Sequence, residues 1–592
     1  MKPTQKLFIP KESGTLSDAL LAFGLAKVAA EVVEQMTGSR KVMIEDVGGW
    51  YGIDAGVEIE EEWLERIRPF EQAPFVASSK ITVPDDLQSA ILVRSVDAEW
   101  DNLREFQALR KQIADAKAAG AEMEQLLADK KPAPDWTIVT YLGDYRMQAQ
   151  ANHNSLIEQW RRCEQPLLAL NLRTIFELFA APPVDRAAII ARWKKAAKAV
   201  DLMVETTASQ LFNPHMGKGQ NRTKANGLAM SNEKSFWLLE YLKTVGLWAA
   251  AAPRNATNAD VRKTYVLLPR RLRLAAHDEI FARFRDRLWN SSSIKLDVKA
   301  ALLYTEVALT YSIETENLGL FGGGSVQNLV AGMDVASYML LSQNSYTMVN
   351  LAALGVPDWA AEIVSFEQAE RFKSVIEEHL ERIDAIGEEK SEGAALLQAY
   401  RDFVAGGQLR AFFDFTSGYS SYLMSAIERS QFYVKPFSET NMRRLIEMKD
   451  AKLSPILANQ GFRNVADAIR RSTVIPQYLG RKTSRFDIRY GLGQDLKRRS
   501  QYADDFIQAL SEFMQSYNEE NLRVHERTKG ASRRKAITTE DIADVVGLID
   551  EYGPQTICHL LIAFGYARDP KAKEEEGAEA ADATSVVAET ND

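Results

Sequence analysis

Residues 211–243 organise this chain, because a polar, glycine-rich segment there leads directly into an apolar helix. Residues 211–227 read LFNPHMGKGQNRTKANG, and residues 231–243 read SNEKSFWLLEYLK. The first half contains three glycines and three Lys/Arg residues but almost nothing apolar to bury. The second half predicts a helix, since Phe236, Leu239 and Leu242 are spaced for one buried face and Ser231 or Asn232 can cap its start.

A glycine-rich, basic loop that ends at a helix start suits a polyanion, because its backbone N–H groups can approach phosphates and its bases can neutralise them. Its amides, Asn213 among them, can also reach base edges. The candidate nucleic-acid contacts in this loop are Lys218, Gln220, Asn221, Arg222 and Lys224. A solvated surface loop is the alternative. Nucleotide hydrolysis is not expected, because no hydroxyl residue follows Lys218 as a Walker loop requires.

The composition is that of an ordinary soluble protein, and 592 residues are enough for about three domains. No run approaches 18 apolar residues and the start lacks the apolar core of a signal peptide, so a cytoplasmic protein without membrane contact is expected. The two cysteines, Cys163 and Cys558, are far apart, which argues against a disulfide framework or a zinc site. No cofactor and no metal ion are expected.

The net charge of −9 conceals an asymmetry along the chain. Between Arg443 and Lys535 there are 20 Lys/Arg against 11 Asp/Glu, and the rest of the chain has an excess of 18 acidic residues. A basic segment within an acidic protein indicates nucleic acid better than the overall charge does.

The predicted fold class is mainly α with a mixed α/β N-terminal part, in several domains that end in a helical bundle. Residues 1–95 predict a mixed α/β region, and residues 96–407 a mainly helical central region that carries the 211–230 loop and short strands. Residues 408–568 predict a basic helical bundle, and residues 569–592 a disordered acidic tail.

Two further segments of the central region are candidates for nucleic-acid contact. Arg270, Arg271 and Arg273 follow a predicted strand at 263–269 and could clamp phosphates, or could simply lie on the surface of a helical domain. A glycine run follows at 322–324, where the backbone could approach a DNA groove closely or could serve as a flexible linker. The candidate residues there are Gly322, Gly323, Gly324, Gln327 and Asn328.

In the C-terminal bundle, clusters of basic residues alternate with aromatic ones, which suits a single strand or a duplex backbone; solvated helix faces are the alternative. The candidate contacts are Arg481, Lys482, Arg485, Lys497, Arg498, Arg499, Arg533 and Arg534.

No enzyme is expected from the sequence, which lacks the common nucleophile and zinc-protease motifs. Among six histidines, only the dipeptide His277-Asp278 offers an alternative, since metal-dependent phosphohydrolases and nucleases use that pair. The dipeptide also reads as the beginning of an ordinary helix. A helical scaffold that binds only protein is a third interpretation.

Four segments together resemble the large subunit of a type I CRISPR interference (Cascade) complex of subtypes A, B and their relatives. They are residues 16–25, LSDALLAFGL; the loop from Phe212 to Lys224 with the helix 236–243; residues 486–492, FDIRYGL; and residues 517–521, YNEEN.

The resemblance implies an RNA-guided antiviral role without catalysis. The N-terminal region would contact the 5′ handle of the guide RNA, recognise the protospacer-adjacent motif in duplex DNA and help to open it. The bundle would hold the displaced strand of the R-loop beside small subunits. Partners would be the backbone and small subunits and a separate helicase-nuclease that cuts. Such systems also make a small subunit from an internal start, for which Met424, Met442 and Met448 are candidates.

Overall fold

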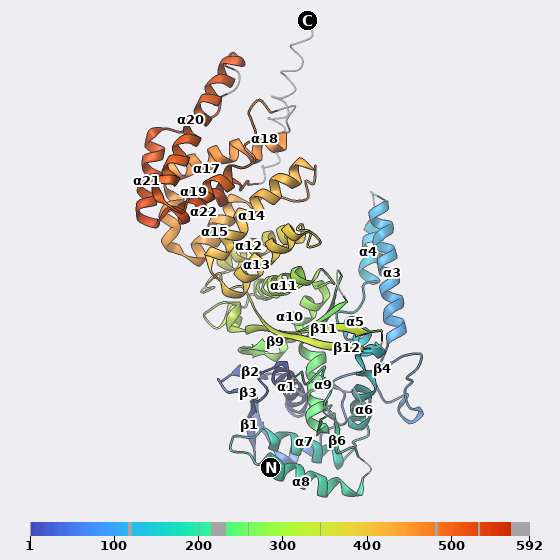
Figure 1. Cartoon of the computed structure of the whole chain (residues 1–592). Helices are drawn as coiled ribbons and strands as arrows, with labels where there is room; N and C mark the ends of the chain where they lie inside the picture. The colour runs from blue at the N-terminus through green and yellow to red at the C-terminus, as the bar shows by residue number, and fades with distance from the viewer. Residues whose placement is uncertain are drawn as a thin grey trace, which may run out of the picture. The chain divides into compact units, whose positions relative to one another are not determined.

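The helix expected after the polar segment is α9 (Trp237–Ala250), and it packs along α1 (Leu16–Thr37) (Figure 1). Both helices are apolar on nearly all sides, as is typical of helices buried within a domain. They touch backbone to backbone: a Cβ added to Gly24 would lie 1.8 Å from the carbonyl oxygen of Leu242, and one added to Gly246 would lie 1.9 Å from that of Leu20. Glycine is therefore required at both positions of this crossing.

The computed structural model describes residues 2–116, 121–200, 202–214, 233–257, 260–343, 345–360, 362–479, 484–530 and 533–569. The chain forms two compact units, Met1–Pro357 and Asp358–Asp592. The first mixes strands and helices and the second is helical, so the predicted fold class is confirmed. The acidic tail from 570 onward lies outside the described residues.

Two four-stranded antiparallel sheets belong to the first unit. One has the order β1-β3-β2-β10 and the other β12-β11-β9-β8. The strands of the first sheet are β1 (Thr4–Pro10), β2 (Met43–Asp46), β3 (Trp50–Ile59) and β10 (Arg271–Arg273). Those of the second are β8 (Ala251–Ala256), β9 (Val261–Pro269), β11 (Val330–Ser342) and β12 (Ser345–Gly355). The chain passes from β9 straight into β10, so this one connection links both sheets.

Helices and two small sheets complete the first unit. The helices are α2 (Glu61–Leu64), α3 (Val96–Asp115), α4 (Ala121–Asp129), α5 (Trp136–Leu142), α6 (Gln150–Arg161), α7 (Leu167–Leu178), α8 (Arg186–Ala196), α10 (Leu274–Arg287) and α11 (Ser293–Glu314). Strand β4 (Phe75–Ala77) pairs with β5 (Val93–Ser95), and β6 (Glu205–Thr207) pairs with β7 (Lys234–Phe236).

The second unit is a bundle of helices. They are α12 (Phe366–Asp384), α13 (Ser391–Gly406), α14 (Leu409–Glu428), α15 (Glu439–Lys449), α16 (Ser454–Ala458), α17 (Gln460–Ser472), α18 (Val474–Leu479), α19 (Leu492–Arg499), α20 (Ala503–Arg527), α21 (Thr539–Tyr552) and α22 (Pro554–Gly565). Throughout the described ranges, no helix is both long and apolar enough to cross a membrane.

The boundary between the units differs from the predicted domain boundaries. Residues 1–95 are not separate from the central region, because β2 pairs with β10 and α1 packs on α9. The other predicted boundary, at 407/408, falls inside the second unit, where α13 packs on α14 and α12 on α15. Aromatic residues hold that junction together: the ring of Phe403 stacks on Trp359 at 5.0 Å and lies 4.9 Å from Phe412.

Candidate nucleic-acid interface

The structure brings together two candidates that lie about fifty residues apart in the sequence, the arginines of 270–273 and the glycine run of 322–324. The backbone N–H groups of Arg270 and Arg271 donate to the carbonyl oxygen of Leu329, at 2.8 and 3.3 Å. The Arg270 guanidinium donates to the carbonyl oxygen of Gln327 at 3.3 Å. These bonds fix the glycine segment against the beginning of β10.

The glycine segment is an ordered turn, so the linker interpretation is wrong. It contains the short 3-10 helices η4 (Leu318–Phe321) and η5 (Val326–Asn328), with Gly322 and Gly323 between them at φ values of +58° and +80°. Glycine adopts these angles without strain. Phe321 is fully buried beneath the turn, and the side-chain amide of Asn328 closes it by donating to the Phe321 carbonyl at 3.0 Å.

The three arginines remain exposed beside this turn. In β10, Leu272 is buried, whereas Arg271 and Arg273 project from the opposite face, as alternation along a strand requires. The Arg271 side chain is 64% exposed, and its Nε lies 3.6 Å from a carboxylate oxygen of Glu45. The Nη1 atom of Arg271 also lies close to Gly322.

We call this exposed patch the arginine–glycine surface; it comprises Arg270, Arg271, Arg273, Gly322, Gly323 and Asn328. A neighbouring ion pair, Lys11 with Asp46 at 2.6 Å, is neutral, and Glu45 offsets the charge of one arginine, so the patch keeps a net positive charge. Gly324 is buried, and the amide of Gln327 donates to the Val356 carbonyl at 3.2 Å, so these two predicted residues support the turn from within. Flexible cations beside bare backbone are a combination that can approach a phosphate chain.

Residues 215–232 lie outside the described residues, and with them Lys218, Gln220, Asn221, Arg222 and Lys224. The preceding Asn213 is fully buried, so it cannot reach a base edge as predicted. Its amide donates to Glu240 at 2.7 Å, and its oxygen accepts a hydrogen bond from Lys243, which also pairs with Glu240 at 2.9 Å. This buried network attaches the segment before the loop to α9, while β7 joins the segment after it to β6.

In the second unit, Arg534 is a structural residue and not a candidate contact. It is 6% exposed, and its guanidinium stacks on Phe486 at 3.6 Å and Tyr517 at 4.6 Å from the ring centroids. Its charge is balanced by Glu520 at 3.1 Å. Glu520 also pairs with Arg489 at 3.2 Å. Two of the motifs that carried the resemblance, 486–492 and 517–521, therefore meet in one buried network.

The other bases of this unit have acidic neighbours. Lys497 pairs with Asp414 at 3.0 Å, Arg498 with Asp495 at 2.5 Å and Arg499 with Glu512 at 2.9 Å. All three close the C-terminal turn of α19, where positive charge is favoured for purely helical reasons. Arg533 is exposed, and Arg485 lies before the network of Arg534; Arg481 and Lys482 lie outside the described residues.

The alternative enzyme site at His277-Asp278 is not supported by its geometry. His277 is fully buried between Phe23 and Phe281, and its Nε2 lies 3.1 Å from the carbonyl oxygen of Ala249. Burial lowers the pKa of His277 to about 4, so the ring is neutral at physiological pH. Asp278 is occupied by Lys27 at 2.6 Å. The two side chains thus have separate structural partners.

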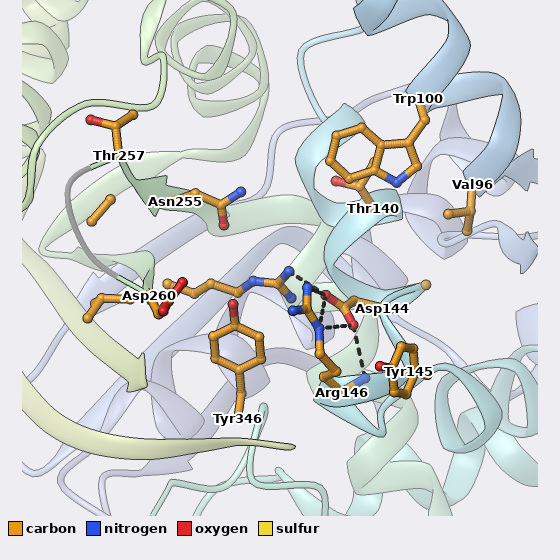
Figure 2. A pocket seen from close by; sticks show the side chains of 14 residues that line it. Val96, Trp100, Thr140, Asp144, Tyr145, Arg146, Asn255, Thr257, Asp260 and Tyr346 are labelled. Carbon is orange, nitrogen blue, oxygen red and sulfur yellow. Dashed lines mark hydrogen bonds and ion pairs between the residues drawn. The ribbon is translucent and has the colours of Figure 1, made fainter. Parts of the chain in front are cut away.

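A cavity of about 530 Å³ in the first unit was not anticipated from the sequence (Figure 2). Asp144 lies on one wall and accepts hydrogen bonds from Arg146, at 2.6 Å from Nη2, and from Arg262. Both guanidiniums lie over the ring of Tyr346, at 5.3 and 4.3 Å from its centroid. Burial opposes ionisation of Asp144, but the two arginines outweigh it and lower its pKa.

A signal for this cavity was present in the sequence. Near the start of strand β9, two cations, Arg262 and Lys263, precede a mostly apolar run, and both are buried. Buried Lys and Arg require partners, and here these are Asp144 and Asp297.

In comparisons with known proteins, the chain matches no family model and no curated sequence.

Proposed function

We propose that this protein is the non-catalytic, nucleic-acid-binding large subunit of a type I CRISPR RNA-guided interference complex, acting in the cytoplasm. The observation that carries the proposal is the arginine–glycine surface, where three exposed arginines adjoin an exposed glycine turn. Arginine suits phosphate because its charge is permanent and its donors are fixed in a fork. The choice of a type I CRISPR complex, among nucleic-acid-binding assemblies, rests on the resemblance of the four sequence segments.

In this role the arginine–glycine surface contacts the duplex that carries the protospacer-adjacent motif, and the 211–230 loop contacts the 5′ handle of the guide RNA. The turn suits a groove because Gly322 and Gly323 present no side chain, and Asn328 beside them is exposed. The exposed bases of the helical unit, Arg498 and Arg533 among them, hold the displaced strand of the R-loop. Backbone and small subunits and a recruited helicase-nuclease complete the assembly.

The helical unit also bears on the proposed internal starts. A product that begins at Met442 or Met448 lacks α14, and one that begins at Met424 lacks most of it. Helix α14 covers α22, where His559 stacks on Phe413 at 5.8 Å. Each product would therefore expose an apolar side of α22 and would need a partner to cover it. A small subunit that docks on a complex has such a partner. Detection of a C-terminal fragment in expressed material tests this idea, and its absence with the start codons intact contradicts it.

The test of the main proposal is DNA affinity across a salt series, with motif-containing duplex, single strand and guide RNA, and with and without magnesium. Wild-type protein should bind with a negative slope of log affinity against log salt and should not cleave. Replacing Arg270, Arg271 and Arg273 with Ala should reduce that slope by about 2.7, since each phosphate contact contributes about 0.9. The matched control is Arg104→Ala, which removes another highly exposed arginine of the same unit, 71% exposed in α3.

Other outcomes separate the alternatives. Cleavage that requires magnesium would favour an enzyme. If that enzyme used the buried His277, His277→Ala should abolish the cleavage. An unchanged slope in the triple variant would contradict a role for this surface. Absence of binding to any of the three nucleic acids would favour the helical scaffold that binds only protein.

A further inference from the structure

We propose that the cavity around Arg146, Arg262 and Tyr346 binds a nucleoside monophosphate, with its phosphate at the arginines and its base between the aromatic and amide groups of the rim. This site lies in the first unit and uses none of the residues of the arginine–glycine surface. The inference goes beyond the proposed function, because a chain that never touched duplex DNA could still bind a nucleotide here.

The arginine end of the cavity favours an anion. Two guanidiniums share Asp144, so one positive charge remains at that end. Asp260 lies on the side of the cavity away from Arg146 and makes the described lining neutral overall (Figure 2). Arg146 uses Nε and Nη2 on Asp144, and its side chain is 31% exposed, which leaves Nη1 for a ligand. The Arg262 side chain is 8% exposed, and its Nε and Nη1 are buried without a hydrogen-bond partner among the described residues. Arg262 therefore contributes its charge, and Nη1 of the more exposed Arg146 is the donor that a ligand oxygen can reach.

The rim supplies surfaces for a planar ring. Trp100 is 38% exposed and Tyr145 is 65% exposed, and both line the cavity. Figure 2 shows Asn255 and Thr257 on the side of the cavity opposite Trp100. Aromatic rings stack on bases of any sequence, and an amide can both donate to and accept from a base edge.

Other ligand classes fit less well. A divalent cation would need carboxylate oxygens, but Asp144 is already engaged by two arginines and Asp260 is the one other carboxylate among the lining residues described. An apolar ligand would leave the arginine donors unpaired. The volume of about 530 Å³ lies within the range of small-molecule sites.

The cavity is held in shape by its neighbours. Gly143, which precedes Asp144, approaches α3 so closely that an added Cβ would lie 2.2 Å from a methyl group of Val96. The ring of Tyr346 comes from β12 and lies under guanidiniums from the η2 turn (Tyr145–Met147) and from β9. The anion-binding groups are therefore positioned before a ligand arrives, which reduces the entropic cost of binding.

The test is titration calorimetry of the full chain with the four ribonucleoside 5′-monophosphates, the corresponding nucleosides and inorganic phosphate. We expect at least one monophosphate to bind about tenfold or more tightly than its nucleoside, because a charged hydrogen bond is lost with the phosphate. Arg146→Gln should weaken binding by a similar factor, and Trp100→Ala should weaken it through the base. The control Arg104→Gln removes an exposed charge from α3 outside the cavity and should leave affinity unchanged.

Equal affinity for monophosphate and nucleoside, or no binding of any monophosphate at millimolar concentration, would overturn the proposal without relying on a variant. A second arm uses oligonucleotides with and without a 5′-phosphate. Tighter binding of the phosphorylated strand, reversed by the free nucleotide, assigns the site to a strand end; tighter binding of the free nucleotide assigns it to a mononucleotide. The triple variant of the arginine–glycine surface should lose duplex binding but keep nucleotide binding. The two measurements therefore test the two proposals separately.

Discussion

The contact between α1 and α9 makes a sharp prediction for Gly24→Ala and Gly246→Ala. In each case the new Cβ would lie less than 2 Å from a backbone carbonyl oxygen of the other helix, at 1.8 Å from Leu242 and 1.9 Å from Leu20. A backbone atom cannot rotate away as a side chain can, so the helices must separate. Because the clashing atom is backbone and lies under 2 Å away, the cost falls at the upper end of the about 1–3 kcal/mol typical of overpacking, which exceeds the roughly 1 kcal/mol that Ala gains over Gly within a helix. Each variant should therefore unfold at lower denaturant.

Tryptophan fluorescence during urea unfolding reports on the first structural unit, which contains α1 and α9. Of the ten tryptophans, all except Trp359 lie in the first unit. The matched control is Gly547→Ala in α21, where no described atom lies within 4 Å of the added Cβ. That variant should stabilise the helical unit slightly and leave the fluorescence transition unchanged. A Gly24→Ala protein as stable as wild type would refute the close crossing of α1 and α9.

Three further predictions concern ionisable groups. Burial and the nearby charge of Asp18 raise the pKa of Asp334 from 3.8 to about 6. The folded state therefore binds the proton more tightly, and ionisation of Asp334 lowers stability as the pH rises from about 4 to 6. Asp334→Asn removes this loss, so it should stabilise the protein by up to roughly 3 kcal/mol above pH 6 and have no such effect near pH 4. Melting curves recorded across this pH range measure the difference. Arg534→Ala should destabilise the helical unit by up to about 3 kcal/mol in urea followed by circular dichroism, because its contacts with Phe486 and Tyr517 are lost and Glu520 keeps Arg489 as its paired cation. Arg498→Ala, which removes a 75% exposed side chain, should cost less than about 0.5 kcal/mol in the same assay.

Much of the fold could be predicted because local patterns agree with the final structure. The largely apolar residues 16–25 lie within α1, and the predicted strand at 263–269 became most of β9. The domain boundary predicted at residue 95 failed because the decisive contact, between β2 and β10, is distant in sequence. A local break was also missed: the helical pattern of residues 494–518 is interrupted between α19 and α20, where the hydroxyl of Ser500 donates to the Lys497 carbonyl at 2.8 Å.

The candidate site was predicted in its parts but not in its assembly. Arginine clusters and glycine runs are visible in a sequence. Their contact depends on the pairing of β10 with β2 and on the hydrogen bonds from the Arg270 and Arg271 backbone to the Leu329 carbonyl. Burial separates residues of the same type: Arg271 is exposed, while Arg534 is enclosed by two aromatic rings. A charge count cannot make that distinction, since it depends on aromatic and acidic partners from other helices.

The most direct test of the central claim is hydrogen–deuterium exchange of the full chain with and without bound duplex DNA. If the arginine–glycine surface is the interface, peptides covering 269–273 and 318–329 should be protected together in the complex. Peptides covering Arg104 on α3 should exchange at the same rate in both states. Protection confined to other parts of the chain, with both segments of the surface unchanged, would contradict the account.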